Sequence, residues 1–127
     1  MIPQKKSSQK KTSSKTINAR RAGHQYERDL AKELRELLDD EDISTSRYSS
    51  RKLDDAKVDI FGTQNYGFHI QAKRYKNNPN LFEILNEMPT DDCINTIFWK
   101  KPHVGEIVCM TKQDFYELLI ILVNEGK

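Results

Sequence analysis

The sequence predicts an α/β protein in which a mixed central sheet of about five strands is flanked by helices. Three observations indicate this fold class. Apolar residues recur every three or four positions over residues 22–38 and again over residues 115–123, which is the spacing of amphipathic helices. Five short segments between them are bounded by glycine, proline or polar residues, as strands commonly are. At 127 residues, the chain has room for a single hydrophobic core.

The first half of the chain is expected to contain a helix and three strands. Residues 43–48 alternate weakly as a strand, residues 49–55 read as a loop, and residues 57–61 form a second short strand that stops at Gly62. Gly62 and Gly67 bracket a predicted hairpin. Its second arm, residues 68–75, is the third strand.

The second half is expected to contain a helix, two strands and a last helix. Pro79 opens a short helix that Pro89 stops. Residues 93–99 and 104–110 read as strands joined by a turn. Thr111 is the expected N-cap of the last helix, with Asp114 in the first turn. The predicted order is therefore αβββαββα, with the helices packed around the sheet.

Charge divides the chain near residue 21. Residues 1–21 hold seven basic and no acidic residues, while the remaining 14 basic residues and all 19 acidic residues follow. Residues 1–17 are mainly Lys, Ser, Thr and Gln, so we expect a disordered basic arm there and a single domain over residues 18–127. The arm is either a solvated leader or an electrostatic arm for nucleic acid.

Two classes of protein do not fit this composition. No segment approaches the roughly 18 apolar residues of a membrane span, and the basic N-terminus lacks the apolar stretch of a secretory signal. We therefore expect a soluble protein in a reducing cytoplasm, of a prokaryote or of a cell that hosts a virus. Cys93 and Cys109 lack the CxxC spacing of zinc sites and disulfide scaffolds, so we expect buried free thiols.

Glu27 is unusual among the charged residues of the first helix. On a helical wheel it falls inside the apolar stripe, about 140° wide, that is made of Tyr26, Leu30, Ala31, Leu34, Leu37 and Leu38. Burying an ionised carboxylate without a partner costs several kcal/mol. Glu27 is therefore either a boundary residue paired with a nearby Arg or part of a site that offers a metal or a wet cleft.

A second group of polar residues lies on the predicted strands. Asp59 ends a short strand, while Gln71 and Lys73 share one face of the next. A carboxylate, an amide oxygen and an ammonium at one sheet edge are what a Mg²⁺-dependent phosphodiesterase needs, because oxygen ligands hold the hard cation. The alternative is an ordinary polar strand face with a surface lysine.

Three segments resemble the motifs of the PD-(D/E)xK nuclease superfamily in order and approximate spacing: GHQYERDL (23–30), VDIFG (58–62) and FHIQAKRY (68–75). The helix motif is similar to that of archaeal-type Holliday-junction resolvases. The QAKRY strand looks more like Mrr-type restriction nucleases, in which Gln commonly replaces the acidic residue. The resemblance covers residues 20–76 and implies a restriction-endonuclease-like fold; beyond residue 76, only the order of elements matches.

The resemblance also implies roles for four residues. Asp59 would be the central metal ligand, Gln71 a second ligand through its side chain or a nearby backbone oxygen, and Lys73 the catalytic lysine. Glu27 would complete the metal or water shell. The implied cofactor is Mg²⁺, with Mn²⁺ able to substitute. Because Gln71 is neutral, metal affinity should be lower than with an acidic residue; Asp54 and Asp55 could substitute as ligands, or lie in a solvated loop.

Basic residues gather around these motifs, which predicts a DNA-binding face. His69 is read as a DNA contact or a structural residue. Resolvases of this type resemble one another in an Arg and a Ser between the first two strands, but residues 49–57 offer no unique match. The candidate DNA contacts are Arg20, Arg21, Arg47, Ser49, Ser50, Arg51, Lys52, Arg74 and Lys76, with Lys57 beside them.

These observations predict a Mg²⁺-dependent DNA endonuclease similar to Holliday-junction resolvases. Two symmetric cuts in a four-way junction imply a homodimer. The apolar last helix is either its interface or a packed core helix. Two alternatives stay open: an Mrr-type or general endonuclease, and a DNA-binding protein of the same fold that has lost catalysis.

Overall fold

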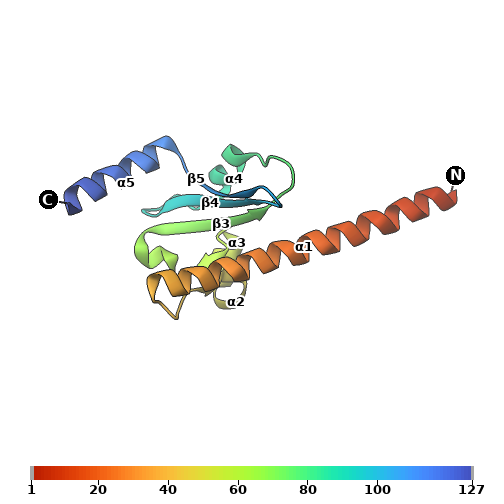
Figure 1. Ribbon diagram of the computed structural model, residues 1–127, viewed down its shortest axis with the longest axis horizontal. Helices are drawn as coiled ribbons and strands as arrows, with labels where there is room; N and C mark the ends of the chain where they lie inside the picture. Colours follow the sequence, from red (N-terminus) through yellow and green to blue (C-terminus); the bar gives the residue numbers. More distant parts are fainter. Residues whose placement is uncertain (1, 127) are drawn as a thin grey trace.

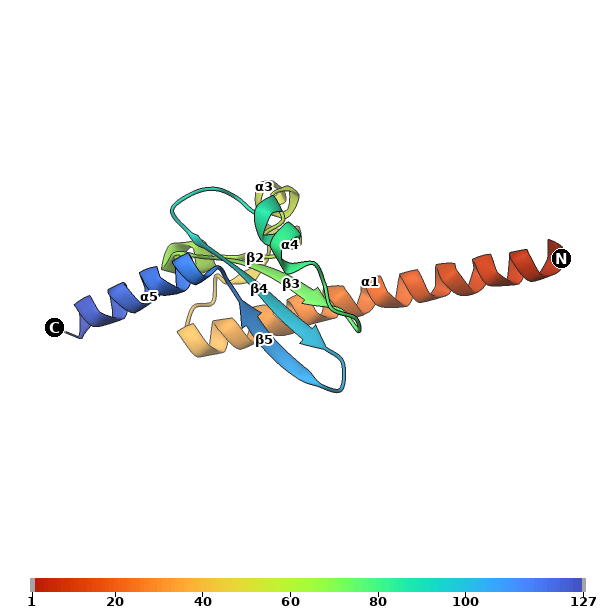
Figure 2. The ribbon, with the colours of Figure 1, turned by 90° about the horizontal axis from the view of Figure 1, so that it is seen from above.

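A long helix lies across a small sheet in this structure, a computed structural model that describes the backbone of residues 2–126 and the side chains of residues 17–126 (Figures 1 and 2). The helices are α1 (Ile2–Leu38), α2 (Ser46–Ser49), α3 (Arg51–Asp55), α4 (Leu81–Glu87) and α5 (Lys112–Glu125), with a 3₁₀ turn, η1 (Thr63–Tyr66). The strands are β1 (Ser44–Thr45), β2 (Ile60–Phe61), β3 (Phe68–Arg74), β4 (Ile94–Lys101) and β5 (Gly105–Cys109). The mixed α/β class is confirmed.

The backbone of α1 begins at Ile2, whereas the sequence predicts a disordered arm over residues 1–17. No glycine or proline interrupts residues 4–22, so nothing in the backbone forces the helix to stop there. The side chains of residues 1–16 lie outside those that the structure describes. The boundary at residue 17 and the role of the arm therefore stay predictions.

The strands form two sheets, so the prediction of one five-stranded sheet is wrong. β3 pairs in parallel with β4, and β4 pairs antiparallel with β5. β1 and β2 form a separate antiparallel pair in which each strand has two residues. Strands this short provide too few backbone groups to extend the larger sheet.

The predicted hairpin between residues 57–61 and 68–75 is also wrong, because β2 pairs with β1 instead of β3. Gly62 and Gly67 both have positive φ, 106° and 89°, and η1 turns the chain between them. A Cβ at Gly62 would lie 3.2 Å from Ile43 Cα, so both the backbone conformation and the lack of space require glycine there. Because of this turn, β2 and β3 do not form a continuous ladder of backbone hydrogen bonds.

The segment between β1 and β2 is helical, where the sequence predicts a strand through Tyr48 and then a loop. β1 ends at Thr45, and α2 and α3 follow. The Ser50 side chain accepts a hydrogen bond from Leu53 N at 3.2 Å, which caps α3. In α2, buried Ser46 instead donates its backbone N–H to Asp59 O at 2.8 Å, and this tertiary contact outweighs the weak alternation that indicated a strand.

The core lies between the second half of α1 and one face of β3. Tyr26, Leu30 and Ala31 of α1 are buried against Ile70 and Ala72 of β3. Because successive strand residues point to opposite faces, His69, Gln71 and Lys73 lie on the other face. The predicted alternation of β3 is confirmed, and so is the helix stripe except at Leu37, which is 77% exposed.

The C-terminal helix α5 extends away from the sheet in both views (Figures 1 and 2). Its predicted N-cap is confirmed, since Asp114 N donates a hydrogen bond to Thr111 Oγ1 at 3.1 Å. None of its residues is buried, so the alternative of a packed core helix is wrong for this chain alone. Within residues 2–126, no helix combines the length and apolar character that crossing a bilayer requires.

Candidate functional site

Asp59 lies directly before β2, and hydrogen bonds fix it against β3. Its backbone N donates to Ile70 O at 2.8 Å, and its carbonyl accepts from Ser46 N at 2.8 Å. Its carboxylate Oδ2 accepts from Ala72 N at 2.7 Å and from Gln71 Nε2 at 3.0 Å. Asp59 therefore holds one position relative to β3 although β2 does not pair with that strand.

Gln71 and Lys73 lie on the same face of β3, as the sequence predicts. Gln71 is 6% exposed, and its Oε1 is buried with no hydrogen-bond partner among the described residues. Because Gln71 donates through Nε2, it orients the Asp59 carboxylate and leaves an acceptor oxygen unused. Lys73 is half-buried as a residue, and its ammonium lies 5.5 Å from the centre of the Tyr75 ring.

Glu27 projects from α1 toward the same region, and its side chain is only 12% exposed. Arg47 Nη2 lies 3.7 Å from Glu27 Oε1, so Glu27 has the nearby Arg that the boundary-residue alternative requires. Burial, followed by the negative charge of Asp59, raises the pKa of Glu27 to about 7, against the opposing effects of Arg47 and Lys73. The influence of Asp59 and Lys73 means that Glu27 shares their electrostatic environment.

The pKa of Asp59 is raised as well. Burial is the main cause that raises its pKa, while the hydrogen bond from Ala72 N and the charge of Lys73 act in the opposite direction. Asp54 on α3 raises the pKa of both Asp59 and Glu27. The structure therefore brings the four predicted site residues together, with Asp54 close enough to act on them. Asp55 instead is exposed and pairs with Arg51 at 3.8 Å.

A cleft of about 560 Å³ opens on the Arg47 side of this cluster. Arg28 and Arg35 of α1 contribute to it, although the wheel placed both outside the apolar stripe. Arg35 Nη1 donates to Ile43 O at 2.9 Å, which ties α1 to the segment before β1. The cleft is lined by Arg28, Ala31, Arg35, Ser44, Thr45, Arg47 and Tyr48.

Basic side chains also surround His24 on α1. Burial lowers the pKa of His24 first, and the charges of Arg47, Arg20 and Arg28 lower it further. Arg20, His24 and Arg28 are spaced four residues apart, so they follow one face of α1. Together with the cleft, they form a basic surface beside Glu27, which we call the arginine face: Arg20, Arg28, Arg35 and Arg47.

The other candidate DNA contacts lie in three places. Arg21 is exposed on α1, while Arg51 and Lys52 are exposed on α3 and Lys57 follows it. Ser50 caps α3, and Ser49 Oγ hydrogen-bonds to Ser44 Oγ. Arg74 ends β3, and exposed Lys76 follows.

The sequence predicted only one of the three arginines that line the cleft, Arg47. Arg28 and Arg35 were not predicted as DNA contacts. A helical wheel separates buried from exposed positions, but it does not show which residues of other segments lie nearby.

The structure also contains a group that the sequence did not predict. His69, Asp91 and Cys93 place their ligand atoms within 4.8 Å of one another. The sequence indicated buried free thiols, but Cys93 and Cys109 are both half-buried and unpaired. The spacing of the three residues matches no short motif, so only the fold brings them together.

Comparison with protein-family models, with curated proteins and with solved structures gives no match for this chain.

Proposed function

We propose that this chain is a Mg²⁺-dependent DNA endonuclease that acts on four-way junctions, with the PD-(D/E)xK fold that its motifs resemble. The supporting observation is the convergence of Glu27, Asp59, Gln71 and Lys73 beside the arginine face. These residues come from three separate segments, and Asp59 is hydrogen-bonded to Gln71. Two partly buried carboxylates whose pKa values are both raised, next to a lysine, are typical of a hydrolytic site.

The donor set fits Mg²⁺. Glu27 and Asp59 provide carboxylate oxygens, and Gln71 provides a buried oxygen with no partner among the described residues. Hard oxygen ligands are those that Mg²⁺ prefers. To bind the same ion as Asp59, the Gln71 amide would turn so that Oε1, instead of Nε2, faces the carboxylate. When bound, Mg²⁺ would polarise the phosphodiester and acidify a water.

The protein's own residues have distinct roles in this proposal. The Ala72 amide holds the Asp59 carboxylate in place. The Lys73 ammonium stabilises the negative charge that develops on the phosphate. Glu27, whose side chain is 12% exposed and whose pKa is influenced by Asp59 and Lys73, would complete the shell of the metal or of the attacking water. Arg47 pairs with Glu27 when no substrate is present and can shift to a phosphate when DNA binds.

The arginine face supports DNA as the substrate. Arg28, Arg35 and Arg47 line one cleft, and a guanidinium can contact a phosphate through two parallel hydrogen bonds. Since these contacts address the backbone and not the bases, they favour recognition of DNA shape over sequence. A branched duplex is therefore the preferred substrate in our proposal.

The proposal includes a homodimer in which α5 of each copy occupies an apolar groove of the other. The groove has a volume of about 250 Å³, and its lining includes Leu34, Leu38, Phe68, Ile70, Phe98 and Val108. On α5, Phe115, Leu119, Ile120 and Leu122 are 42–65% exposed. An apolar helix and an apolar groove left uncovered on one chain complement each other. Reciprocal exchange covers both, with two-fold symmetry.

Oligomeric state tests the dimer separately from catalysis. We expect light scattering after size exclusion to give twice the chain mass for the wild type, and the mass of one chain for Ile120→Lys. Glu117→Lys, on the same helix, is the matched control and should stay dimeric. A wild type that is monomeric across the accessible concentration range contradicts the exchange.

Cleavage of a labelled four-way junction tests the catalytic proposal. The junction and a linear duplex of matched sequence are each incubated with Mg²⁺ and with EDTA. We expect paired, Mg²⁺-dependent cuts in the junction. Equal cutting of both substrates would instead identify a general endonuclease, and tight binding without cutting would identify a DNA-binding protein that lacks catalysis.

A further inference from the structure

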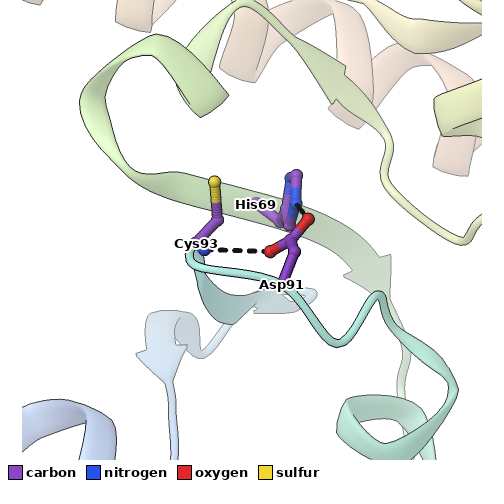
Figure 3. A group of neighbouring side chains, drawn as sticks. All are labelled: His69, Asp91 and Cys93. Atoms are coloured by element: carbon purple, nitrogen blue, oxygen red, sulfur yellow. Dashed lines mark hydrogen bonds and ion pairs between the residues drawn. The ribbon is translucent and has the colours of Figure 1, made fainter.

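His69, Asp91 and Cys93 form a second polar cluster outside the candidate site. His69 is 3% exposed, and its Nε2 lies 2.8 Å from Asp91 Oδ2. Figure 3 shows His69 on β3, with Asp91 and Cys93 on the segment that leads into β4. The ring nitrogen, a carboxylate oxygen and the sulfur lie within 4.8 Å of one another. We propose that these three side chains bind Zn²⁺.

The donor set selects this metal class. An imidazole nitrogen, a carboxylate oxygen and a thiolate sulfur are the ligands of tetrahedral zinc sites, whereas Mg²⁺ does not use sulfur. Zinc–ligand bonds of about 2.0–2.3 Å place neighbouring ligand atoms roughly 3.3–3.8 Å apart. To reach these values from the 2.8 Å between His69 Nε2 and Asp91 Oδ2, the Asp91 carboxylate would move slightly away from His69, while the Cys93 sulfur lies within 4.8 Å of both ligand atoms.

Two observations favour this adjustment. The Asp91 side chain is 45% exposed and can shift into solvent. The Cys93 sulfur is held by a long contact of 3.8 Å to Gln64 O, which is a weak interaction for a thiol. The exposed side of Asp91 also provides a path for the ion and space for water as a fourth ligand.

The backbone around the cluster is already fixed. Cys93 N donates to Asp91 Oδ1 at 2.9 Å, and this hydrogen bond fixes the position of Asp91 relative to Cys93. Ile94 N donates to Gly67 O at 2.8 Å, and Ile94 lies opposite Phe68 in the β3–β4 ladder. The segment that carries Asp91 and Cys93 is therefore anchored beside His69 without the ion.

The His69 ring presents Nε2 to the cluster. Its Nδ1 is buried and has no hydrogen-bond partner among the described residues, while Nε2 faces the Asp91 carboxylate and is the nitrogen that would bind the ion. Asp92, next to both turn ligands, adds negative charge that favours a cation.

Cobalt absorption tests the proposal on the full chain. The protein is reduced and stripped with EDTA, both reagents are removed, and Co²⁺ is titrated. We expect the near-ultraviolet charge-transfer band of a cobalt–thiolate bond to saturate at one Co²⁺ per chain for this site, and to be lost when Zn²⁺ is added. Cys93→Ser should lose the band, whereas Cys109→Ser, the matched control at the other half-buried thiol, should keep it.

A second variant keeps the test valid if Cys93→Ser fails to fold. Asp91→Asn changes a partly exposed ligand, so it should fold and bind Co²⁺ at least about tenfold more weakly, as ligand and supporting-residue changes do at metal sites. Circular dichroism of each metal-free variant verifies the fold. Absence of the band in the wild type, its survival in Cys93→Ser, its loss in Cys109→Ser, or unchanged affinity in Asp91→Asn would each overturn the proposal.

Discussion

One face of β3 carries two polar clusters with different chemistry. Gln71 and Lys73 lie beside carboxylates from α1 and from the segment before β2, whereas His69 lies beside a carboxylate and a thiol from the segment before β4. The first cluster offers oxygen ligands next to the arginine face, and the second offers nitrogen, oxygen and sulfur next to Asp92. The strand provides regularly spaced positions, and the segments packed beside each position determine its chemistry.

The largest expected effect that tests this comparison is the loss of cleavage in Asp59→Asn. The change keeps an oxygen that can accept from Ala72 N but removes the charge, so we expect cleavage of the junction to fall at least about a hundredfold. Asp55→Asn, at an exposed carboxylate paired with Arg51, is the matched control and should cleave normally. A single-turnover assay with saturating Mg²⁺ measures both. Cleavage within a few fold of wild type would exclude Asp59 from the site.

The next effect concerns the stability of the metal-free protein. The pKa of Glu27 is raised from 4.5 to about 7, so the unfolded chain releases this proton first as the pH increases. The contribution of Glu27 to stability should therefore be highest below pH 4.5, decline between pH 4.5 and 7, and level off above pH 7. The total decline should be about 3 kcal/mol. Asp59 contributes in the same direction, because its pKa is also raised.

Urea unfolding in EDTA at several pH values measures this decline. Glu27→Gln should flatten it, while Glu36→Gln, at an exposed position of the same helix, should leave it unchanged. Mg²⁺ should restore stability above pH 7, since it compensates the two carboxylate charges. A pH dependence identical in Glu27→Gln and wild type would show that Glu27 is not the group responsible.

How much of these clusters the sequence predicts depends on whether the signal is local. The helix stripe identified Glu27, and the alternation of β3 paired Gln71 with Lys73, because both periodicities arise within one element. The cluster of His69, Asp91 and Cys93 joins distant segments through the parallel pairing of β3 with β4. No local pattern encodes that pairing, so the cluster was visible only in the fold.

The same distinction explains the errors in the predicted fold. The weak alternation after Ile43 suggested a longer strand, but α2 begins at Ser46, whose backbone N–H donates to Asp59 O. The two glycines that suggested a hairpin have positive φ around a 3₁₀ turn, which is a local property that does not determine which strand pairs with which. The exposure of α5 likewise depends on whether a partner covers it, and a single chain does not encode that contact locally.

DNA affinity provides a smaller effect that separates the two clusters. Arg28→Ala removes one guanidinium from the cleft beside Glu27, so binding should weaken several-fold and the slope of log affinity against log salt should fall by about one. Lys112→Ala, at the start of α5, is the matched control and should leave both values unchanged. Fluorescence anisotropy in Ca²⁺, at several salt concentrations, measures binding without cleavage. An unchanged slope for Arg28→Ala would remove the arginine face from the DNA-binding surface.

Gln71→Glu should have a modest effect on the metal requirement. A third carboxylate beside Asp59 increases the negative charge around the ion, so the Mg²⁺ concentration for half-maximal cleavage should fall a few-fold. In EDTA the same variant should be less stable than the wild type at neutral pH, because the added charge is then uncompensated. Gln64→Glu, on η1, serves as the control for adding a carboxylate near β3. If the Mg²⁺ requirement is unchanged, Gln71 orients Asp59 and does not bind the ion.

The smallest expected effects are those of each cluster on the other. His69 and Gln71 are two residues apart on an extended strand, which separates their side-chain positions by about 7 Å, and contacts at this distance usually couple weakly. Asp59→Asn should therefore keep the cobalt–thiolate band within about twofold in affinity while cleavage is lost. Asp91→Asn should weaken Co²⁺ binding while the Mg²⁺ requirement for cleavage stays within about twofold. Measuring cleavage and Co²⁺ affinity on both variants tests this independence, since a single shared metal site would make each variant lower both quantities together.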